Sequence, residues 1–187
     1  EFDLDRDAIL RDFDAQIKLF NRLFPPQVDQ GKKKPTTFKW MVTRCADAKD
    51  ITAPRELIHL LNELRIEEIK RLENNQHAPG GDVLFDRSVF KLALSSVSEV
   101  RLVQTIYAEY PAQKIFIEKL RDQKTEQTEE SLVTLWEIEP EAAISQAEML
   151  VELGFFQRRD RLGQRTYWVP YLYRDSLQMV QGKAEED

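Results

Sequence analysis

The order of short segments in the last part of the sequence constrains the fold more than any other feature. Three segments with helical spacing of apolar residues follow Pro111: "AQKIFIEKLRD", "TEESLVTLWEI" and "PEAAISQAEMLVELG". The second can be capped by Thr128, and the third has Pro140 in its first turn and Gly154 where its last turn must end. These signals predict three short helices in this order.

Two aromatic-rich runs follow the third helix. Phe155 to Arg158 and Thr166 to Val169 flank the turn "DRLGQ", and this pattern predicts a two-stranded β-hairpin. A closing helix is expected over "YLYRDSLQMVQG". Short helices followed by a hairpin predict a winged-helix domain over 112–187, in which the second and third helices form the helix-turn-helix and the hairpin is the wing.

The chain before this domain is predicted to be helical. Residues 1–35 carry an apolar stripe from Leu4 to Phe24, which indicates one long amphipathic helix, and then the basic loop "PPQVDQGKKKP". Residues 36–111 are expected to form a separate helical domain, with "NNQHAPGG" as its strongest break. The predicted fold class is therefore mostly α, with one short β-hairpin.

Within 36–111 the helices are expected over "TTFKWMVTRCAD", from Pro54 to about Leu72, and from about Val89 to a point before Pro111. Thr36 or Thr37 is the expected cap of the first of these helices.

Composition excludes several classes of protein. The sequence has 187 residues and a formal net charge of −6, which gives no general attraction to nucleic acid or to anionic membranes. The single cysteine, Cys45, rules out a disulfide framework within the chain, and no run of about 18 apolar residues could span a bilayer. We therefore expect a cytoplasmic protein. Its start, "EFDLDRDAIL", lacks a methionine and suggests a piece of something longer.

The motifs of common active sites are missing from the sequence. Neither phosphate-binding glycine pattern, Gly-x-x-x-x-Gly-Lys-Ser/Thr or Gly-x-Gly-x-x-Gly, occurs. His59, His77 and Cys45 are too scattered to indicate a metal site, and the serines stand in ordinary helix and cap contexts. We expect no metal, no catalytic residue and no enzyme activity in this chain alone.

The predicted winged helix lacks the usual features of a DNA reader. Residues 139–153 contain four glutamates and no basic residue, so phosphates would repel this helix. The predicted wing is basic, with arginines at Arg158, Arg159, Arg161 and Arg165. These arginines could contact a phosphate backbone, or they could balance the acidic helix beside them; we favour the second interpretation.

Arg55 is unusual because of its place at the start of a predicted helix. Pro54 is suited to a first turn, but an arginine beside it faces the positive end of the helix dipole. Either Arg55 pairs with an acid nearby, such as Glu56, Asp50 or Asp47, or it binds an anionic ligand.

Three stretches of the sequence carry a resemblance to a known family. They are "ITAPRELIHLLNEL" (51–64), "VSEVRLVQTIYAEYP" (97–111) and "LVELGFFQRRDRLGQRTYWVPYLYRDSLQMVQGKA" (150–184). Together they resemble the C-terminal part of bacterial P-loop ATPases of the AAA+/STAND kind, in which a nucleotide-binding core is followed by a helical lid and a winged helix. The phosphate loop and the acidic Mg²⁺-binding motif of such ATPases are missing from this sequence.

The resemblance implies roles for particular residues. In such ATPases an arginine at the start of a lid helix, called sensor 2, reaches the terminal phosphates of the nucleotide, and Arg55 stands at the matching place. Arg44 is a weaker candidate for the same role. Residues 36–111 would then be lid-like, and ATP and Mg²⁺ would be bound by the core of the parent protein.

The expected function is therefore that of a non-catalytic lid and regulatory region. It would sense nucleotide held by its own N-terminal NTPase core and dock a protein partner through the winged helix, without membrane contact. The alternative is a stand-alone nucleic-acid-binding regulator that uses the arginine-rich wing against phosphates.

Overall fold

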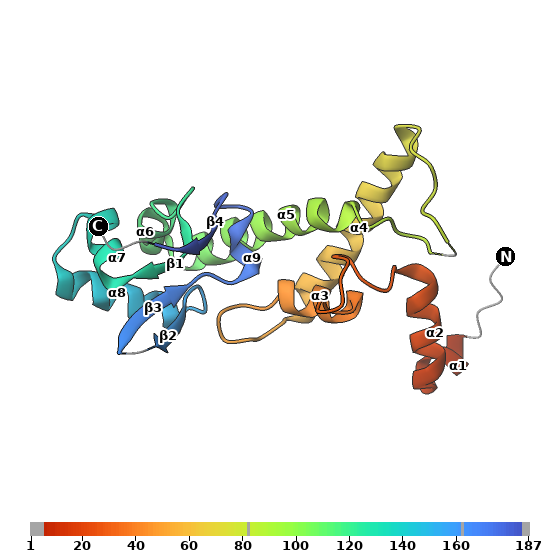
Figure 1. Cartoon of the computed structure of the whole chain (residues 1–187), viewed down its shortest axis with the longest axis horizontal. Helices are drawn as coiled ribbons and strands as arrows, with labels where there is room; N and C mark the ends of the chain where they lie inside the picture. Colours follow the sequence, from red (N-terminus) through yellow and green to blue (C-terminus); the bar gives the residue numbers. More distant parts are fainter. Residues whose placement is uncertain (1–5, 82, 162, 185–187) are drawn as a thin grey trace. The chain divides into compact units, whose positions relative to one another are not determined.

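The computed structural model describes residues 6–81, 83–161 and 163–184, and it is mostly helical with one small four-stranded sheet (Figure 1). The chain forms two compact units. The first consists of Glu1–Trp40 with Leu61–Ala93, and the second of Met41–Leu60 with Leu94–Asp187. The domain boundaries after residues 35 and 111 stay predictions.

The first unit is built around aromatic side chains. Its elements are α1 (Arg6–Arg11), α2 (Phe13–Leu23), the start of α3 (Thr37–Arg44), the later part of α4 (Pro54–Glu73) and the start of α5 (Val89–Arg101). The buried ring of Phe90 lies edge-on to Trp40, with centroids 5.8 Å apart, and 6.3 Å from the ring of Phe24. The Trp40 indole Nε1 donates to Asp29 Oδ2 at 3.1 Å, so its polar atom is satisfied within the unit.

The single long N-terminal helix predicted from Leu4 to Phe24 is wrong, because the helix is interrupted at Asp12. This residue is extended, with φ −116°, and its carboxylate accepts the backbone N–H of Asp14 at 2.9 Å. Aspartate competes with helix interiors by capping, so α1 ends and α2 begins here. Leu4 lies outside the described residues.

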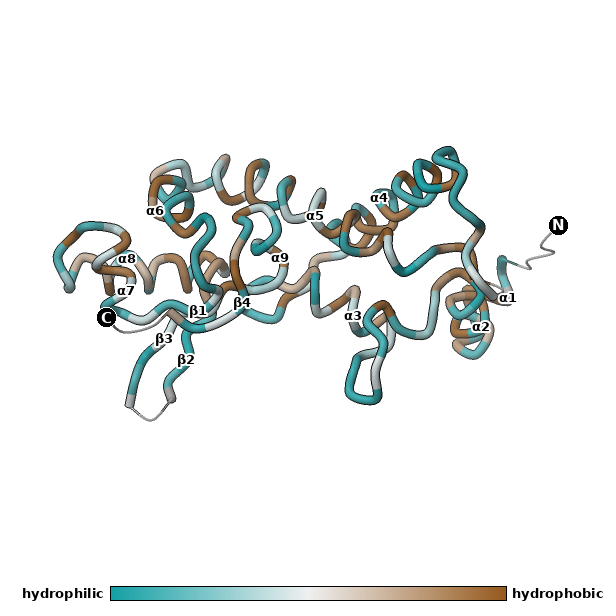
Figure 2. The backbone as a smooth tube through the Cα atoms, turned by 45° about the horizontal axis from the view of Figure 1, so that its top comes forward, coloured by the Kyte–Doolittle hydropathy of each residue, from teal (hydrophilic) through white to brown (hydrophobic). Residues whose placement is uncertain are grey.

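Apolar and polar residues alternate along α2 (Figure 2), and its apolar side chains are not fully covered. None of the side chains described in α2 is buried, and Phe13 is 72% exposed.

Helices α3 and α4 match their predictions: Trp40 N donates to Thr36 O at the start of α3, and α4 runs from Pro54 to Glu73.

The second unit begins with the ends of α3 and α5 and the start of α4. Helix α5 continues as η1 (Leu102–Tyr107), a π-helical segment, and the helical run stops before Pro111 as predicted. The next short elements are η2 (Pro111–Gln113) and α6 (Lys114–Glu118).

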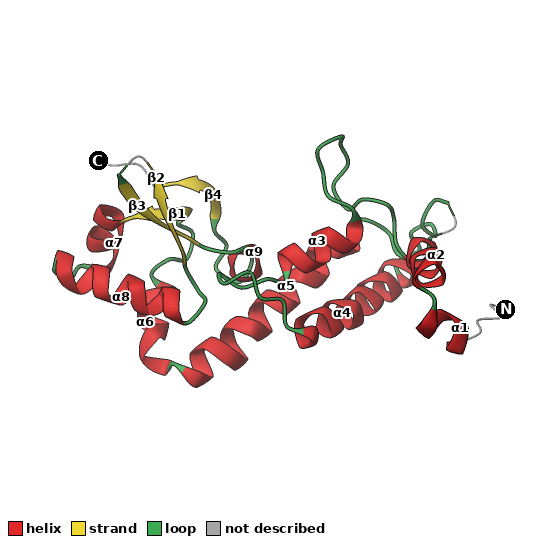
Figure 3. Ribbon diagram, turned by 90° about the horizontal axis from the view of Figure 1, so that it is seen from below, coloured by secondary structure: helices red, strands yellow, loops and turns green. Residues whose placement is uncertain are grey.

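The remainder of this unit combines the sheet with short helices (Figure 3). In chain order the elements are β1 (Lys124–Thr128), α7 (Glu129–Trp136), α8 (Pro140–Glu152), β2 (Gln157–Arg161), β3 (Gln164–Trp168), α9 (Tyr171–Arg174) and β4 (Val180–Lys183). The strand order is β2-β3-β1-β4; β1 pairs with β3 antiparallel and with β4 parallel. The predicted hairpin is confirmed, since β2 pairs with β3 from Gln157 opposite Trp168 to Arg161 opposite Gln164.

The predicted helix ends in this region are confirmed by their capping contacts. Thr128 Oγ1 accepts Ser131 N at 3.0 Å, while Ser131 Oγ accepts Thr128 N at 2.9 Å, which caps α7. Gly154 has φ +77°, and a Cβ there would lie 3.3 Å from Asp47 Oδ2. Glycine is therefore required both by the turn and by the close approach of Asp47.

The predicted closing helix over "YLYRDSLQMVQG" is wrong. Helix α9 has a single turn, and the chain then forms β4, whose Val180 lies opposite Lys124 of β1. Gln178 has φ +52° and Gly182 has φ +144°, values that a helix does not contain. The single hairpin expected from the sequence is therefore part of a larger sheet.

Candidate functional site

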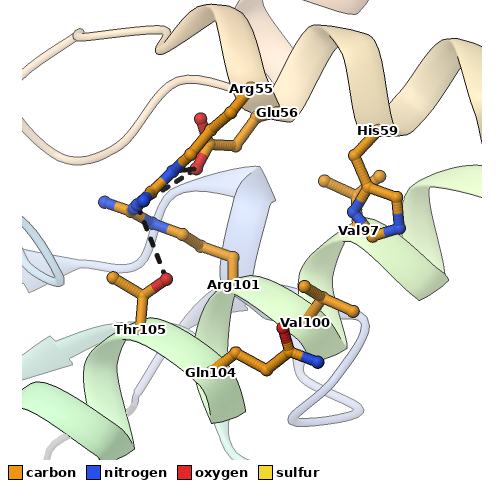
Figure 4. A pocket seen from close by; sticks show the side chains of 8 residues that line it. All are labelled: Arg55, Glu56, His59, Val97, Val100, Arg101, Gln104 and Thr105. Atoms are coloured by element: carbon orange, nitrogen blue, oxygen red, sulfur yellow. Dashed lines mark hydrogen bonds and ion pairs between the residues drawn. The ribbon is translucent and has the colours of Figure 1, made fainter.

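The strongest candidate site is an open pocket of about 460 Å³ in the second unit, at the first turns of α4 (Figure 4). Its lining comes from α4, α5 and η1: Arg55, Glu56, His59, Val97, Val100, Arg101, Gln104 and Thr105. The two valines form an apolar floor, and the other side chains supply hydrogen-bonding groups. The site can therefore hold a polar ligand.

Glu56 is the centre of the site's charge. It is 5% exposed, and its Oε1 accepts Arg55 Nε at 2.9 Å and Arg101 Nη1 at 3.2 Å. Its second oxygen, Oε2, is buried and lacks a hydrogen-bond partner among the described residues. One carboxylate thus faces two guanidinium groups, which leaves the trio with one positive charge.

The two arginines differ in exposure. The side chain of Arg101 is 15% exposed, whereas that of Arg55 is 62% exposed and reaches Thr105, with Nη2 3.5 Å from Oγ1. Of the three acids considered as partners of Arg55 (Glu56, Asp50 and Asp47), the structure pairs it with Glu56. The buried Arg101 is the stronger partner of that carboxylate, because water screens an exposed pair.

Burial shapes the ionisation of Arg101 and Cys45, two groups that feel the charge of Glu56. Burial acts to lower the pKa of Arg101, but Tyr173, Glu56 and Asp47 outweigh it and raise that pKa above its usual value. Burial, and then the charge of Glu56, raises the pKa of the Cys45 thiol to about 12. Cys45 is therefore a neutral thiol at physiological pH.

The π-helical segment η1 supplies part of the lining. A π turn holds one more residue than an α turn, so it changes which side chains face a neighbouring helix. Gln104 and Thr105 of η1 line the pocket together with Arg101 from the end of α5. Such segments are frequent at functional sites, which supports this pocket as the candidate.

The chemistry of this pocket is that of anion binding. Arg55, Thr105, Gln104 and His59 can all donate hydrogen bonds toward a ligand.

Among residues 6–81, 83–161 and 163–184, no group of three or more His, Cys, Asp or Glu side chains could hold a metal ion. Within the same described ranges, no helix is long and apolar enough to cross a membrane.

Arg44, the second sensor candidate, lies in a different environment. Its guanidinium carbon is 3.5 Å from the centroid of the Tyr171 ring, at the start of α9. The structure therefore groups Arg44 with α9 and does not bring it into the lining of the Arg55 pocket.

The arginines of the predicted wing contact acidic side chains. Arg158 Nη1 lies 3.3 Å from Glu148 Oε2, and Arg165 Nη1 lies 3.4 Å from Glu129 Oε1 and 3.7 Å from Glu148 Oε1. These pairs agree with the interpretation that the arginines balance the acidic helix α8. The side chain of Arg161 lies outside the described part of the chain.

Arg159 differs from the other wing arginines. It donates from Nε and Nη2 to Gln157 Oε1, and its Nη1 is 3.8 Å from Glu126 Oε2. Its guanidinium carbon also lies 4.0 Å from the ring centroid of Trp168.

Sequence reasoning missed several residues of the pocket. Arg101, Gln104 and Thr105 stand in an apolar helical pattern that gave no functional signal, and the ion pair of Glu56 with Arg101 joins segments far apart in the sequence.

Comparisons of the chain with protein-family models, with curated proteins and with solved structures found no match.

Proposed function

We propose that this chain is a non-catalytic lid and regulatory region of a cytoplasmic P-loop ATPase. Arg55 would sense the terminal phosphates of ATP held with Mg²⁺ by a core outside this sequence. The region 112–187 would act as a winged helix that docks a protein partner. Supporting observations come from the pocket of Arg55 and from the charges around α8.

One observation carries the proposal: Arg55 is exposed while its acidic partner has a second, buried arginine. If Arg55 turned toward a phosphate, Glu56 Oε1 would keep its hydrogen bond from Arg101 at 3.2 Å. No buried carboxylate would lose all its partners, so the movement would cost little. The exposed fork of Arg55 suits bidentate contact with a phosphate.

The helix start adds to this preference. Arg55 is in the first turn of α4, where the helix dipole favours an anion. A phosphate in front of the helix would remove the penalty of placing a cation there. Thr105 and Gln104 would supply further donors on the opposite side of the same pocket.

The order of elements supports a winged helix over 112–187. Helices α7 and α8 precede the β2–β3 hairpin, and β1 pairs with β3 beside it. The acidic α8 and the ion pairs of Arg158 and Arg165 favour a protein partner over a phosphate backbone.

The test is ATP hydrolysis by the longer protein that contains this region together with its phosphate loop. Arg55→Ala should lower turnover by about 100-fold, because an electrostatic contact to the reacting phosphate is lost. Arg65→Ala, which removes an exposed arginine further along α4, is the matched control and should leave turnover unchanged. Circular dichroism should show that both variants fold. Equal turnover by wild type and Arg55→Ala would remove the sensor role.

The rival function, a nucleic-acid-binding regulator, has a separate test. Fluorescence anisotropy with a labelled DNA duplex at low salt would detect binding through the wing arginines. Binding that weakens steeply with salt and is lost in Arg158→Gln/Arg165→Gln would favour the rival. Absence of binding at low salt would exclude it.

A further inference from the structure

Arg174 is a buried cation that, among the described residues, donates its hydrogen bonds to neutral groups. It is 6% exposed, and it donates from Nε to the Val169 carbonyl at 2.8 Å and from Nη1 to Gln181 Oε1 at 2.6 Å. Its Nη2 is buried and lacks a hydrogen-bond partner among the described residues. A buried charge that lacks an opposite charge is costly, so the surroundings of Arg174 need an explanation.

Two aromatic rings hold Arg174 in place. Its guanidinium carbon lies 4.5 Å from the ring centroid of Trp168 and 4.1 Å from that of Tyr171. The rings themselves pack edge to face, with centroids 5.7 Å apart. The attraction between the cation and each ring offsets part of the cost of burial.

Each ring also carries a second guanidinium. Arg44 lies over Tyr171 at 3.5 Å and Arg159 lies over Trp168 at 4.0 Å. Three arginines from α3, β2 and α9 thus converge on two adjacent rings, all within the second unit. Arg44, Arg159, Arg174, Trp168 and Tyr171 are called the arginine stack below.

The arginines of the stack influence one another's charge. Burial is the largest influence on the pKa of Arg174 and lowers it. Tyr171 acts to raise this pKa, whereas the charges of Arg44 and Arg159 lower it, and the result is a pKa of about 10. Glu126, whose Oε2 is 3.8 Å from Arg159 Nη1, supplies a carboxylate at one end of the stack. Among the groups in the described part of the chain that shift the pKa of Arg174, two are cations and none is a carboxylate.

From this geometry we infer that the arginine stack is an oxyanion-binding site, which takes a phosphate group. Nη2 of Arg174, which lacks a hydrogen-bond partner among the described residues, would supply the buried donor, and Arg44 and Arg159 would add positive charge beside it. Arg159 is 25% exposed and Arg44 is half-buried, so solvent reaches the two outer arginines. A phosphate is suited to the stack because it is negatively charged and has several acceptor oxygens for guanidinium groups.

The site is distinct from the pocket of Arg55. There the buried guanidinium of Arg101 already has Glu56 as its counter-charge. In the stack the buried guanidinium has rings and neutral acceptors, so an added anion gains more. Free phosphate and a phosphate of a nucleic-acid backbone share the chemistry that this site recognises.

Calorimetric titration of the whole chain with inorganic phosphate, against sodium chloride at matched ionic strength, tests the inference. Wild type should bind phosphate, and both Arg44→Gln and Arg159→Gln should weaken that binding at least about tenfold, since each loses a positive charge beside the bound anion. Arg158→Gln is the matched control on the neighbouring position of β2, and its affinity should equal that of wild type. Glu126→Gln should bind phosphate more tightly, because a competing carboxylate is removed.

The outcomes separate the sources of phosphate and decide the inference. A short single-stranded DNA that binds, and fails to bind to Arg44→Gln, supports the stack with a backbone phosphate as its ligand. Equal phosphate affinity in wild type, Arg44→Gln and Arg159→Gln would overturn the inference, and so would heat signals that sodium chloride reproduces. A loss in Arg158→Gln as large as in Arg159→Gln would also overturn it, because general attraction to the wing would then explain binding.

Discussion

Arg101 and Arg174 are both mostly buried arginines of the second unit, but they are neutralised in different ways. Arg101 pairs with the carboxylate of Glu56, whereas Arg174 is held by the rings of Trp168 and Tyr171 and by neutral acceptors. The pKa of Arg101 is raised, while that of Arg174 is lowered to about 10.

The comparison shows that burial alone does not make an arginine a candidate binding residue. What matters is whether a carboxylate already pairs with the buried guanidinium. In the first pocket Arg101 is the buried partner of Glu56, so the exposed Arg55 is the arginine that can move toward a ligand. In the arginine stack the guanidinium of Arg174 is fixed in the interior, and its neighbours Arg44 and Arg159 are partly exposed to solvent. The first arrangement suits a sensor, and the second suits a preformed anion site.

The largest expected effect is on the acid of the first pocket. Glu56→Gln should lower the free energy of unfolding by about 3–5 kcal/mol, because Arg101 would stay buried and lose its charged partner. Urea unfolding followed by circular dichroism measures the change. Glu99→Gln, an exposed carboxylate on α5, is the control and should change stability by less than about 0.5 kcal/mol. Equal stability of the two variants would show that Arg101 does not depend on Glu56.

The second effect concerns the rings of the arginine stack. Trp168→Leu should lower the free energy of unfolding by about 2–3 kcal/mol, since packing and the attraction of the ring for Arg159 and Arg174 are both lost. Trp168→Phe keeps a ring, so it should lose about half as much. If Trp168→Phe were as unstable as Trp168→Leu, cation–π attraction would not be what holds Arg174.

Opposite pH dependences distinguish the two regions. The pKa of Cys45, which feels the charge of Glu56, is raised from 9.0 to about 12. Stability from this group is fully present below pH 9 and is lost as the pH rises toward 12, because the unfolded thiol ionises first. For Arg174, whose pKa is lowered to about 10, the sign is reversed, so stability is gained as the pH rises above 10.

The Cys45 contribution can be isolated between pH 8 and pH 10. Over that interval it amounts to a loss of about 1.4 kcal/mol in the free energy of unfolding, which Cys45→Ala should not show. The measurement is the difference between the two pH values in each protein, so that any cavity left by the substitution cancels. The same fall in both proteins would contradict a raised thiol pKa.

The sequence predicted those parts of the fold that depend on local signals. The β2–β3 hairpin follows from its turn, where Gly163 has φ +81°, and the starts of α7 and α4 follow from Thr128 and Pro54. These residues fix backbone geometry by themselves, whatever packs around them.

Elements that depend on distant partners were missed. Strand β1, "KTEQT", has no apolar alternation, since its buried positions are Thr125, Gln127 and Thr128. It is a strand because β3 and β4 flank it, and β4 in turn was mistaken for helix. The same limit applies to the sites: Arg55 was found from its helix start, but the burial of Arg101 and Arg174 depends on tertiary packing.

The smallest expected effect concerns the exposed wing. Arg158→Ala should change the free energy of unfolding by less than about 0.5 kcal/mol, because its pairs with Glu148 and Asp160 are solvent-exposed. The same substitution at Arg159 should cost more, since Arg159 packs on Trp168 and is 25% exposed. Urea unfolding of both variants at low and high salt measures the difference. If high salt abolished the loss of stability caused by Arg159→Ala, Arg159 would be a surface ion-pair residue like Arg158. It would then not belong to the arginine stack.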